Sequence, residues 1–347
     1  MPTILLYGAY GYTGTLTAKL AAQRGVSLIL AGRNEAKTAA IAEQVGMEHR
    51  VFSVEDAADH LDGVGAVLHC AGPFSATSRP MLDACVARGV HYMDITGEIE
   101  VFEAVAARGE EARSAGIVAM PGVGFDVVPT DCMAAYVCAK LPGATELTLA
   151  FYTRGAMSQG TAKTAVENLG KPGYVRRDGK ITEVSPAHEQ RTVDFGAGGI
   201  QQAVAIPWGD VSTAYYTTGV GNITTMVAMP TSMRVGARLS GALGGLLQTG
   251  PVQRFLRNRI EAGPAGPSDE ARRRVTVYVW GEARDAAGNV AQARIATPEG
   301  YTFTADASLR IAQRVLAGEV EPGFHTPAGA FGADLVLSCD GTSREDA

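Results

Sequence analysis

Short apolar runs alternate with helical patterns along residues 3–120. The apolar runs are predicted strands, at 3–7, 27–31, 50–54, 66–70, 91–95 and 117–120. Helical patterns lie between them, at 16–24, 35–45, 80–87 and 98–115. The second of these has the clearest ends, because Asn34 is a favourable N-cap and Gly46 a favourable stop. Alternation of this kind predicts a parallel sheet with helices on both faces.

The pattern changes after about residue 130. Helical patterns occur there at 131–140 and 305–317. Alternating apolar positions predict strands at 146–153, 191–195, 275–284 and 290–297. We therefore predict an α/β protein with two domains. Residues 1–130 are expected to form a Rossmann-type parallel-sheet domain, and residues 131–304 an α+β domain with a mixed or antiparallel sheet. Residues 305–347 are expected to pack back on the first domain.

Composition and charge exclude several classes of protein. Of the 347 residues, 46% are hydrophobic and 19% charged, which excludes a disordered chain. The net charge of −6 gives no electrostatic reason to expect nucleic acid as a partner. The five cysteines and six histidines lack the spacings of disulfide frameworks and metal sites, so we assign no metal. We find no leader and no apolar run of membrane-spanning length, and we expect a cytoplasmic location.

Three glycines, Gly8, Gly11 and Gly14, stand between the first predicted strand and the first predicted helix. Glycine lets the backbone turn sharply and lets a pyrophosphate approach, and the helix N-terminus offers unpaired N–H groups. We predict that this turn binds a dinucleotide. The alternative is a tight turn with no ligand. The turn residues that we also assign to the site are Tyr10, Tyr12 and Thr13.

The end of the second predicted strand indicates which dinucleotide binds. Sites that prefer NAD place a carboxylate there to bind the ribose 2′-hydroxyl, but this chain has Arg33 and no acid before Glu35. A guanidinium pairs well with a 2′-phosphate, so we predict NADP(H) as the cofactor. The alternative is a surface arginine near a helix start.

The loop after the fourth predicted strand is expected to run beside the cofactor. Ala71, Gly72 and Pro73 suit a backbone wall there, and we assign them to the cofactor site. Phe74 either contacts the cofactor or only packs against its neighbours.

Candidate catalytic residues follow the next two strands. Tyr92 and Asp94 share one face of a strand whose carboxyl end opens toward the expected cofactor crevice, and Asp126 lies in the loop after the strand at 117–120. We take these three as the catalytic candidates. The alternative for Asp94, and for Thr96 beside it, is to cap the following helix. The alternative for Asp126 is a structural role as a tie of the loop between the two domains, and Asp131 is expected to cap the helix at 131–140.

Tyr136 and Lys140 have the four-residue spacing of the catalytic pair of short-chain dehydrogenases. That mechanism also needs a serine one or two turns upstream, which is absent, and the pair lies beyond the predicted Rossmann strands. We therefore interpret this spacing as a chance match.

The chain resembles the saccharopine dehydrogenase-like oxidoreductases, and in particular the branch with trans-acting enoyl reductases. Four segments carry the resemblance: Gly8–Gly14 with Leu30–Arg33, Cys70–Phe74, His91–Glu98, and Pro121–Asp131. The resemblance implies a nicotinamide-dependent reductase with a Rossmann domain and an inserted mixed-sheet domain. In the enoyl reductase branch, the substrate is a carbon–carbon double bond on an acyl chain.

We therefore expect an NADPH-dependent oxidoreductase that acts on an apolar C=C, C=N or C=O substrate, either a small molecule or carrier-bound. The alternative is a non-catalytic NADP-binding protein that interacts with a partner or with lipid. Residues 233–259 combine arginines with small and apolar residues. This segment is interpreted as a lid, as a peripheral lipid contact, or as a buried helix or dimer contact. We expect a homodimer.

Overall fold

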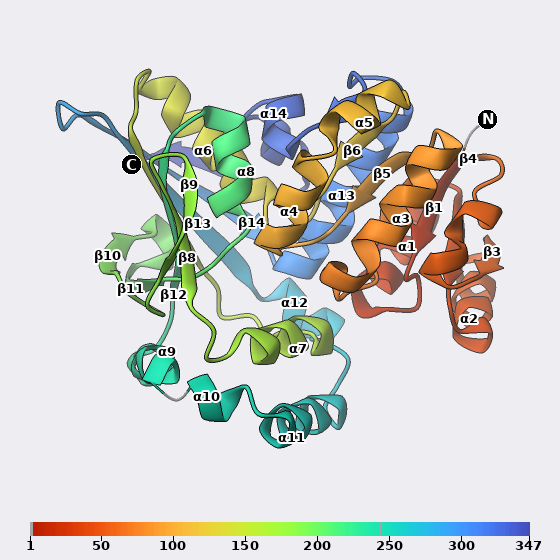
Figure 1. Ribbon diagram of the computed structural model, residues 1–347, viewed down its shortest axis with the longest axis horizontal. Coiled ribbons are helices and arrows are strands. Elements are labelled where there is room, and N and C mark those ends of the chain that lie inside the picture. The colour runs from red at the N-terminus through yellow and green to blue at the C-terminus, as the bar shows by residue number, and fades with distance from the viewer. Residues whose placement is uncertain (1–2, 243) are drawn as a thin grey trace. The chain divides into compact units, whose positions relative to one another are not determined.

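The structure is a computed structural model that describes residues 3–242 and 244–347, without the side chains of 239–242 and 246. The chain divides into two compact units (Figure 1). The first unit contains Met1–Val128 and Tyr301–Asp340, and the second contains Pro129–Gly300 and Gly341–Ala347. The expectation that 305–347 returns to the first domain is wrong for its last seven residues. Strand β16 (Ser343–Asp346) pairs with a strand of the second unit.

The first unit is built on a seven-stranded parallel sheet in the order β15-β6-β5-β4-β1-β2-β3. Its strands are β1 (Thr3–Tyr7), β2 (Leu28–Gly32), β3 (Glu48–Val51), β4 (Val64–His69), β5 (His91–Asp94), β6 (Val118–Met120) and β15 (Gly323–Phe324). The chain builds outward in one direction from β1 to β3 and in the other from β4 to β6. The strand order therefore reverses between β1 and β4, which is the place where open parallel sheets bind ligands. The predicted Rossmann-type sheet is confirmed.

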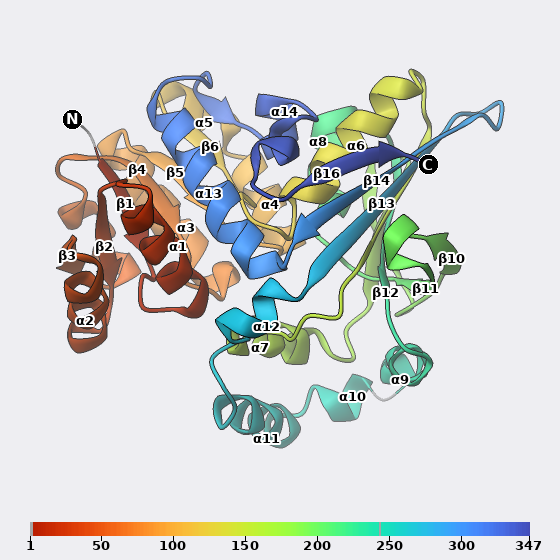
Figure 2. The same ribbon diagram turned by 180° about the vertical axis from the view of Figure 1, so that it is seen from behind.

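Helices cover both faces of this sheet (Figures 1 and 2). The elements are α1 (Tyr12–Gln23), α2 (Glu35–Val45), η1 (Val54–His60), α3 (Phe74–Arg88), α4 (Ile99–Ala106), α5 (Gly109–Ser114), α13 (Gly300–Leu316), α14 (Pro327–Phe331) and η3 (Leu335–Ser338). Right-handed crossovers that run in opposite directions along a sheet put α1 and α3 on opposite faces. The helix predicted at 98–115 is two helices, α4 and α5, interrupted at 107–108.

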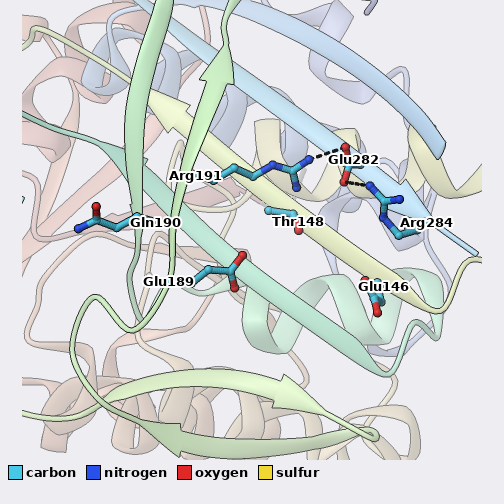
Figure 3. A pocket seen from close by; sticks show the side chains of 7 residues that line it. All are labelled: Glu146, Thr148, Glu189, Gln190, Arg191, Glu282 and Arg284. Atoms are coloured by element: carbon cyan, nitrogen blue, oxygen red, sulfur yellow. Dashed lines mark hydrogen bonds and ion pairs between the residues drawn. The ribbon is translucent and has the colours of Figure 1, made fainter. Parts of the chain in front are cut away.

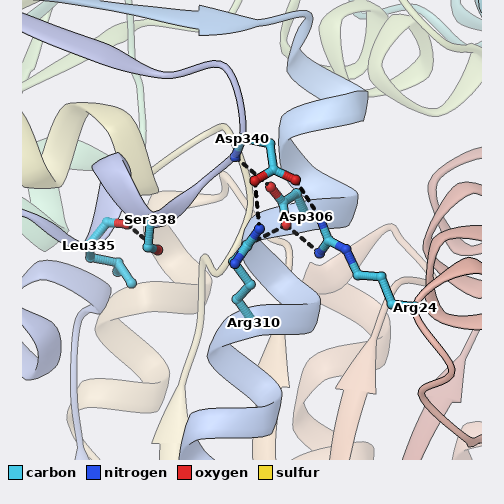
Figure 4. Close-up of polar contacts among 6 residues, drawn as sticks. All are labelled: Arg24, Asp306, Arg310, Leu335, Ser338 and Asp340. Carbon is cyan, nitrogen blue, oxygen red and sulfur yellow. Dashed lines mark hydrogen bonds and ion pairs between the residues drawn. The ribbon is translucent and has the colours of Figure 1, made fainter.

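Four charged side chains join α13 to the end of α1 (Figure 4). Asp306 of α13 accepts hydrogen bonds of 2.5 Å from both Arg24 and Arg310. The two arginines also bind Asp340, each at 2.9 Å. Burial alone would raise the pKa of Asp306, but hydrogen bonds from Arg24, the Asp340 N–H and Arg310 outweigh it and hold this pKa below its usual value. This cluster ties the C-terminal part of the first unit to its N-terminal helix.

The second unit contains a mixed sheet whose main path runs β10-β11-β12-β7-β13-β14-β16. Its strands are β7 (Glu146–Tyr152), β8 (Gly173–Arg177), β9 (Lys180–Val184), β10 (Gln190–Asp194), β11 (Ile200–Ala205), β12 (Asn222–Ala228), β13 (Thr276–Arg284), β14 (Val290–Pro298) and β16. β12 pairs with β7 in parallel, and the other pairs are antiparallel. The predicted mixed sheet is confirmed.

The helices of the second unit are α6 (Val128–Lys140), α7 (Gln159–Asn168), η2 (Gly196–Gly198), α8 (Asp210–Thr218), α9 (Thr231–Ala242), α10 (Gly244–Leu247), α11 (Gly250–Glu261) and α12 (Asp269–Arg273). Met226 of β12 and Trp280 of β13 form a hydrophobic cluster with Phe195. Among the helices that the structure describes, none is long and apolar enough to cross a membrane.

Candidate functional site

The glycine turn follows β1 and is tightly packed. Gly8 has a positive φ of 84°, and a Cβ on it would lie 2.9 Å from the Cβ of Ala71 in the loop after β4. A Cβ on Gly14 would lie 2.3 Å from the carbonyl oxygen of Gly8. Neither position has room for a side chain, because the turn, the start of α1 and the β4 loop approach one another so closely.

The N-terminus of α1 points its N–H groups toward this turn. Gly11 is the N-cap, and in the described part of the chain no side chain caps α1 and no acid lies in its first turn. Tyr12 and Thr13, the first two residues of α1, are half-buried there. A helix start without a competing carboxylate fits the pyrophosphate of a dinucleotide. The residues of this site therefore fit the predicted cofactor.

Basic side chains follow the end of β2. Arg33 is exposed and makes no ion pair with the residues that the structure describes. Asn34 caps α2 as predicted, by accepting a 3.0 Å hydrogen bond from the N–H of Lys37. The Lys37 ammonium lies 5.9 Å from the centre of the Tyr10 ring, and Tyr10 in turn lies against Gly32. Sequence reasoning missed Lys37, although its place in the first turn of the helix after Arg33 was a usable signal.

The loop after β4 is held from two sides. The Thr77 hydroxyl of α3 lies 2.7 Å from the carbonyl oxygen of Ala71 and 3.0 Å from that of Pro73. The Glu98 carboxylate accepts hydrogen bonds of 2.9 and 2.8 Å from the N–H groups of Phe74 and Ser75 at the start of α3. These contacts fix the Ala71–Pro73 backbone beside the glycine turn.

The catalytic candidates Tyr92 and Asp94 are both fully buried. The Tyr92 hydroxyl donates a 2.6 Å hydrogen bond to Asp94, which also accepts bonds of 2.9 and 3.0 Å from the N–H groups of Thr96 and Gly122. Burial raises the pKa of Asp94 to about 6, although these three hydrogen bonds oppose the rise. In this arrangement Asp94 joins the loops that follow β5 and β6. The N-cap of α4 is Glu98, and its N–H donates a 3.0 Å hydrogen bond to the Thr96 hydroxyl, so Thr96 satisfies one N–H group at the start of this helix.

Asp126 differs from Asp94 in its surroundings. The residue is half-buried, and its carboxylate accepts no hydrogen bond from the described residues. Oδ2 lies 2.8 Å from the place that a Cβ on Gly97 would take, so the carboxylate faces the backbone after β5. Burial of the carboxyl raises the pKa of Asp126 to about 6. A carboxyl with a pKa near neutrality and without a fixed partner is suited to proton transfer.

The loop that carries Asp126 is anchored by α13. The Phe125 N–H donates a 2.9 Å hydrogen bond to the Thr304 hydroxyl, and Gly124 packs against the same side chain. Sequence reasoning missed Thr304, because 179 residues separate it from Phe125 and no local pattern links them.

The remaining candidates lie in the second unit. Asp131 is not the cap of α6, which begins at Val128; it is buried within the first turn and accepts a 2.6 Å hydrogen bond from Thr217. Tyr136 and Lys140 both bind Asp346 of β16. The Tyr136 and Lys140 side chains thus have a structural partner in their own unit.

Residues 4–120 match the family model described as the saccharopine dehydrogenase NADP binding domain. This match covers about a third of the chain, from β1 to β6. The predicted resemblance and the predicted cofactor are thereby confirmed, and the glycine turn, Arg33 and the β4 loop all lie within the matched residues.

Two curated relatives are similar to part of this chain. A Mycobacterium tuberculosis protein that carries the name trans-acting enoyl reductase is 31% identical over 183 residues, which are 48% of this chain and 44% of that protein. The human saccharopine dehydrogenase-like oxidoreductase is 24% identical over 212 residues, 53% of this chain and 49% of that protein. The chain therefore spans about half the length of these relatives.

Among solved structures, apo saccharopine dehydrogenase (L-Glu forming) from Saccharomyces cerevisiae has a TM-score of 0.68 at 12% identity, with 100% of both chains covered. This likeness shows that the two chains share a fold, in which a Rossmann-type sheet is combined with a second, mixed sheet.

A separate hollow of about 240 Å³ lies on the sheet of the second unit (Figure 3). Its lining residues are polar or charged: Glu146, Thr148, Glu189, Gln190, Arg191, Glu282 and Arg284. Glu282 binds Arg191 at 2.6 Å and Arg284 at 3.2 Å, so both arginines are already paired. We assign no catalytic role to this hollow.

Proposed function

We propose that this protein is an NADPH-dependent reductase of an apolar carbon–carbon double bond conjugated to a carbonyl group, with Asp126 as the proton donor. The observation that carries the proposal is the Asp126 carboxyl, which is half-buried, has a pKa raised to about 6 and lies against Gly97. Asp126 lies in the loop that follows the carboxyl end of β6. In the sheet, β6 is two strands away from β4, where the strand order reverses. Ligands of open parallel sheets bind at this edge.

Each residue of the site has a defined task in this proposal. The N–H groups at the start of α1 bind the pyrophosphate, and Arg33 with Lys37 binds the 2′-phosphate. When bound, NADPH supplies a hydride to the β-carbon of the double bond. The electron pair of the double bond moves toward the carbonyl oxygen, and the Asp126 carboxyl gives its proton to the α-carbon. Solvent then reprotonates Asp126.

The substrate class rests on two supports. The names of two relatives include enoyl reductase and oxidoreductase, and the candidate donor is a single half-buried carboxyl. A conjugated enoyl group needs one hydride and one proton, which NADPH and Asp126 together supply. An acyl thioester carried on coenzyme A is the simplest form in which to offer this group.

The experiment mixes the full-length protein with NADPH deuterated at C4 and with a medium-chain enoyl thioester. We expect the absorbance of NADPH to fall and the saturated product to carry one deuterium at its β-carbon by mass spectrometry. An imine and a ketone of similar size serve as comparison substrates. The Asp126→Asn variant is expected to lose this turnover, whereas Glu100→Gln, which changes an exposed carboxylate nearby, is expected to keep it.

Reduction of the imine or the ketone alone would contradict the substrate class. If NADPH binds but none of the three substrates is reduced, the proposal is wrong.

A further inference from the structure

Helices α9 and α11 expose large apolar side chains to solvent. Phe255 of α11 is 64% exposed, and Met233 and Val235 of α9 are each 51% exposed. Both helices lie in a row with α10 along one side of the second unit (Figures 1 and 2). Of the three interpretations of residues 233–259 from sequence, the buried helix is wrong for these side chains. Residue 243 lies outside the described residues.

Polar contacts hold part of α11 in place. Gln253 is its one buried side chain among those described, and it donates hydrogen bonds of 3.0 and 2.9 Å to the carbonyl oxygens of Val166 and Leu247. Two ion pairs also join α11 to α7: Arg257 of α11 binds Glu167 at 3.5 Å, and Glu261 of α11 binds Lys163 at 2.8 Å. In most surface helices the large apolar side chains face inward. Val252, Leu256 and Ile260 of α11 are half-buried at four-residue spacing, whereas Phe255 is mostly exposed.

Positive charge surrounds these exposed apolar side chains. Residues 229–260 contain five arginines and no Asp, Glu or Lys, although the whole chain has a net charge of −6. Arg238, Arg254 and Arg259 are exposed and make no ion pair with any residue that the structure describes. We call Met233, Arg238, Arg254, Phe255 and Arg259 the basic apolar surface.

We propose that the basic apolar surface binds the face of an anionic lipid bilayer. Apolar side chains that enter the headgroup region, combined with arginines that attract anionic lipids, are the pattern of helices that lie on a membrane. A second copy of this chain fits less well. A two-fold contact brings the same surface of each copy together, and the unpaired arginines of the two copies would then repel each other.

The test is flotation of the full-length protein with vesicles of phosphatidylcholine alone and of phosphatidylcholine mixed with phosphatidylglycerol. We expect binding to the mixed vesicles, with weaker binding at high salt because salt screens the charges. Phe255→Ser with Met233→Ser is expected to weaken binding about tenfold or more. Replacing Arg254 and Arg259 by Gln is expected to weaken it about fivefold for each arginine.

Ile200→Ser is the matched control, because Ile200 is 72% exposed on β11, outside the basic apolar surface. It is expected to bind like the wild type, and all variants are expected to keep the wild-type melting temperature. Absence of flotation, or equal flotation of the wild type and the Phe255→Ser variant, would overturn the proposal. So would a dimer in size-exclusion chromatography that Phe255→Ser dissociates, since the surface would then join two copies.

Discussion

The Tyr92 hydroxyl donates a 2.6 Å hydrogen bond to Oδ2 of Asp94, and both side chains are fully buried. Asp94 also accepts hydrogen bonds from two backbone N–H groups, one in the loop after β5 and one in the loop after β6. The pair therefore holds the carboxyl ends of two neighbouring strands in place. Asp126 extends from the second of these loops, so the positions of Tyr92 and Asp94 determine where the proposed proton donor stands.

Tyr92→Phe is predicted to be a stability variant and to keep most of the catalytic rate. Loss of the hydroxyl removes one partner from a buried carboxyl, which is expected to lower the free energy of unfolding by about 1–3 kcal/mol. Urea unfolding and NADPH oxidation measure the two effects on the same sample. A rate that falls about 100-fold at unchanged stability would instead assign Tyr92 to the chemistry.

The pH dependence of stability is predicted from the two raised carboxyl pKa values. Asp94 and Asp126 have pKa values of about 6 in the folded chain, against an ordinary value of 3.8. Between these values the folded chain holds protons that the unfolded chain has released, so the free energy of unfolding falls as pH rises through this window. Urea unfolding at a series of pH values is expected to show a shallower fall for Asp126→Asn than for the wild type. Parallel curves would contradict the raised pKa of Asp126.

Cofactor preference is predicted to depend on the two basic side chains after β2. Arg33→Ala is expected to weaken NADPH binding by about tenfold to 100-fold and NADH binding little, because the guanidinium pairs with the 2′-phosphate. Lys37→Ala is expected to have the same sign and a smaller size, since its ammonium lacks the planar fork. Isothermal titration with both cofactors measures this, with the exposed Arg79→Ala as control. Equal losses for NADPH and NADH would contradict the assignment of Arg33 and Lys37 to the 2′-phosphate.

The charged cluster of α13 is predicted to stabilise the first unit. Asp306→Ala removes the buried one of the two carboxylates that Arg24 and Arg310 share, which leaves them only the exposed Asp340, and it is expected to lower the free energy of unfolding by about 2–4 kcal/mol. Asp340→Ala is the matched control, because Asp340 is mostly exposed and its ion pairs are worth about 1 kcal/mol or less. Urea unfolding measures both losses. Similar losses in the two variants would contradict the expectation that the buried Asp306 contributes more stability than the exposed Asp340.

Local signals made part of the fold predictable. The helix α2 begins and ends at the predicted residues because Asn34 and Gly46 act within one turn of its ends. The start of α6 was missed, since Asp131 is a residue type that suits a cap but here lies inside the helix. The glycine turn and Arg33 were found because their chemistry follows directly from their places beside strands.

Long-range contacts were not predictable in the same way. Asp306 meets Arg24 across 282 residues, and β16 joins β14 through backbone pairing that leaves no periodic pattern in four residues. The surroundings of the candidate site residues also depend on such contacts. Nothing local in the sequence distinguishes Asp94, which accepts three hydrogen bonds, from Asp126, whose carboxyl accepts none from the described residues.

The most direct test of the proposed reaction is the pH dependence of kcat/KM for reduction of the enoyl thioester by NADPH. Asp126 must be protonated to give its proton, so the wild-type value is predicted to be highest below pH 6 and to fall about tenfold for each pH unit above it. Asp126→Asn is predicted to be slower by about 100-fold to 10,000-fold and to lose this dependence. A wild-type profile without an ionisation near 6, or an Asp126→Asn variant that keeps the wild-type rate and profile, would contradict Asp126 as the proton donor.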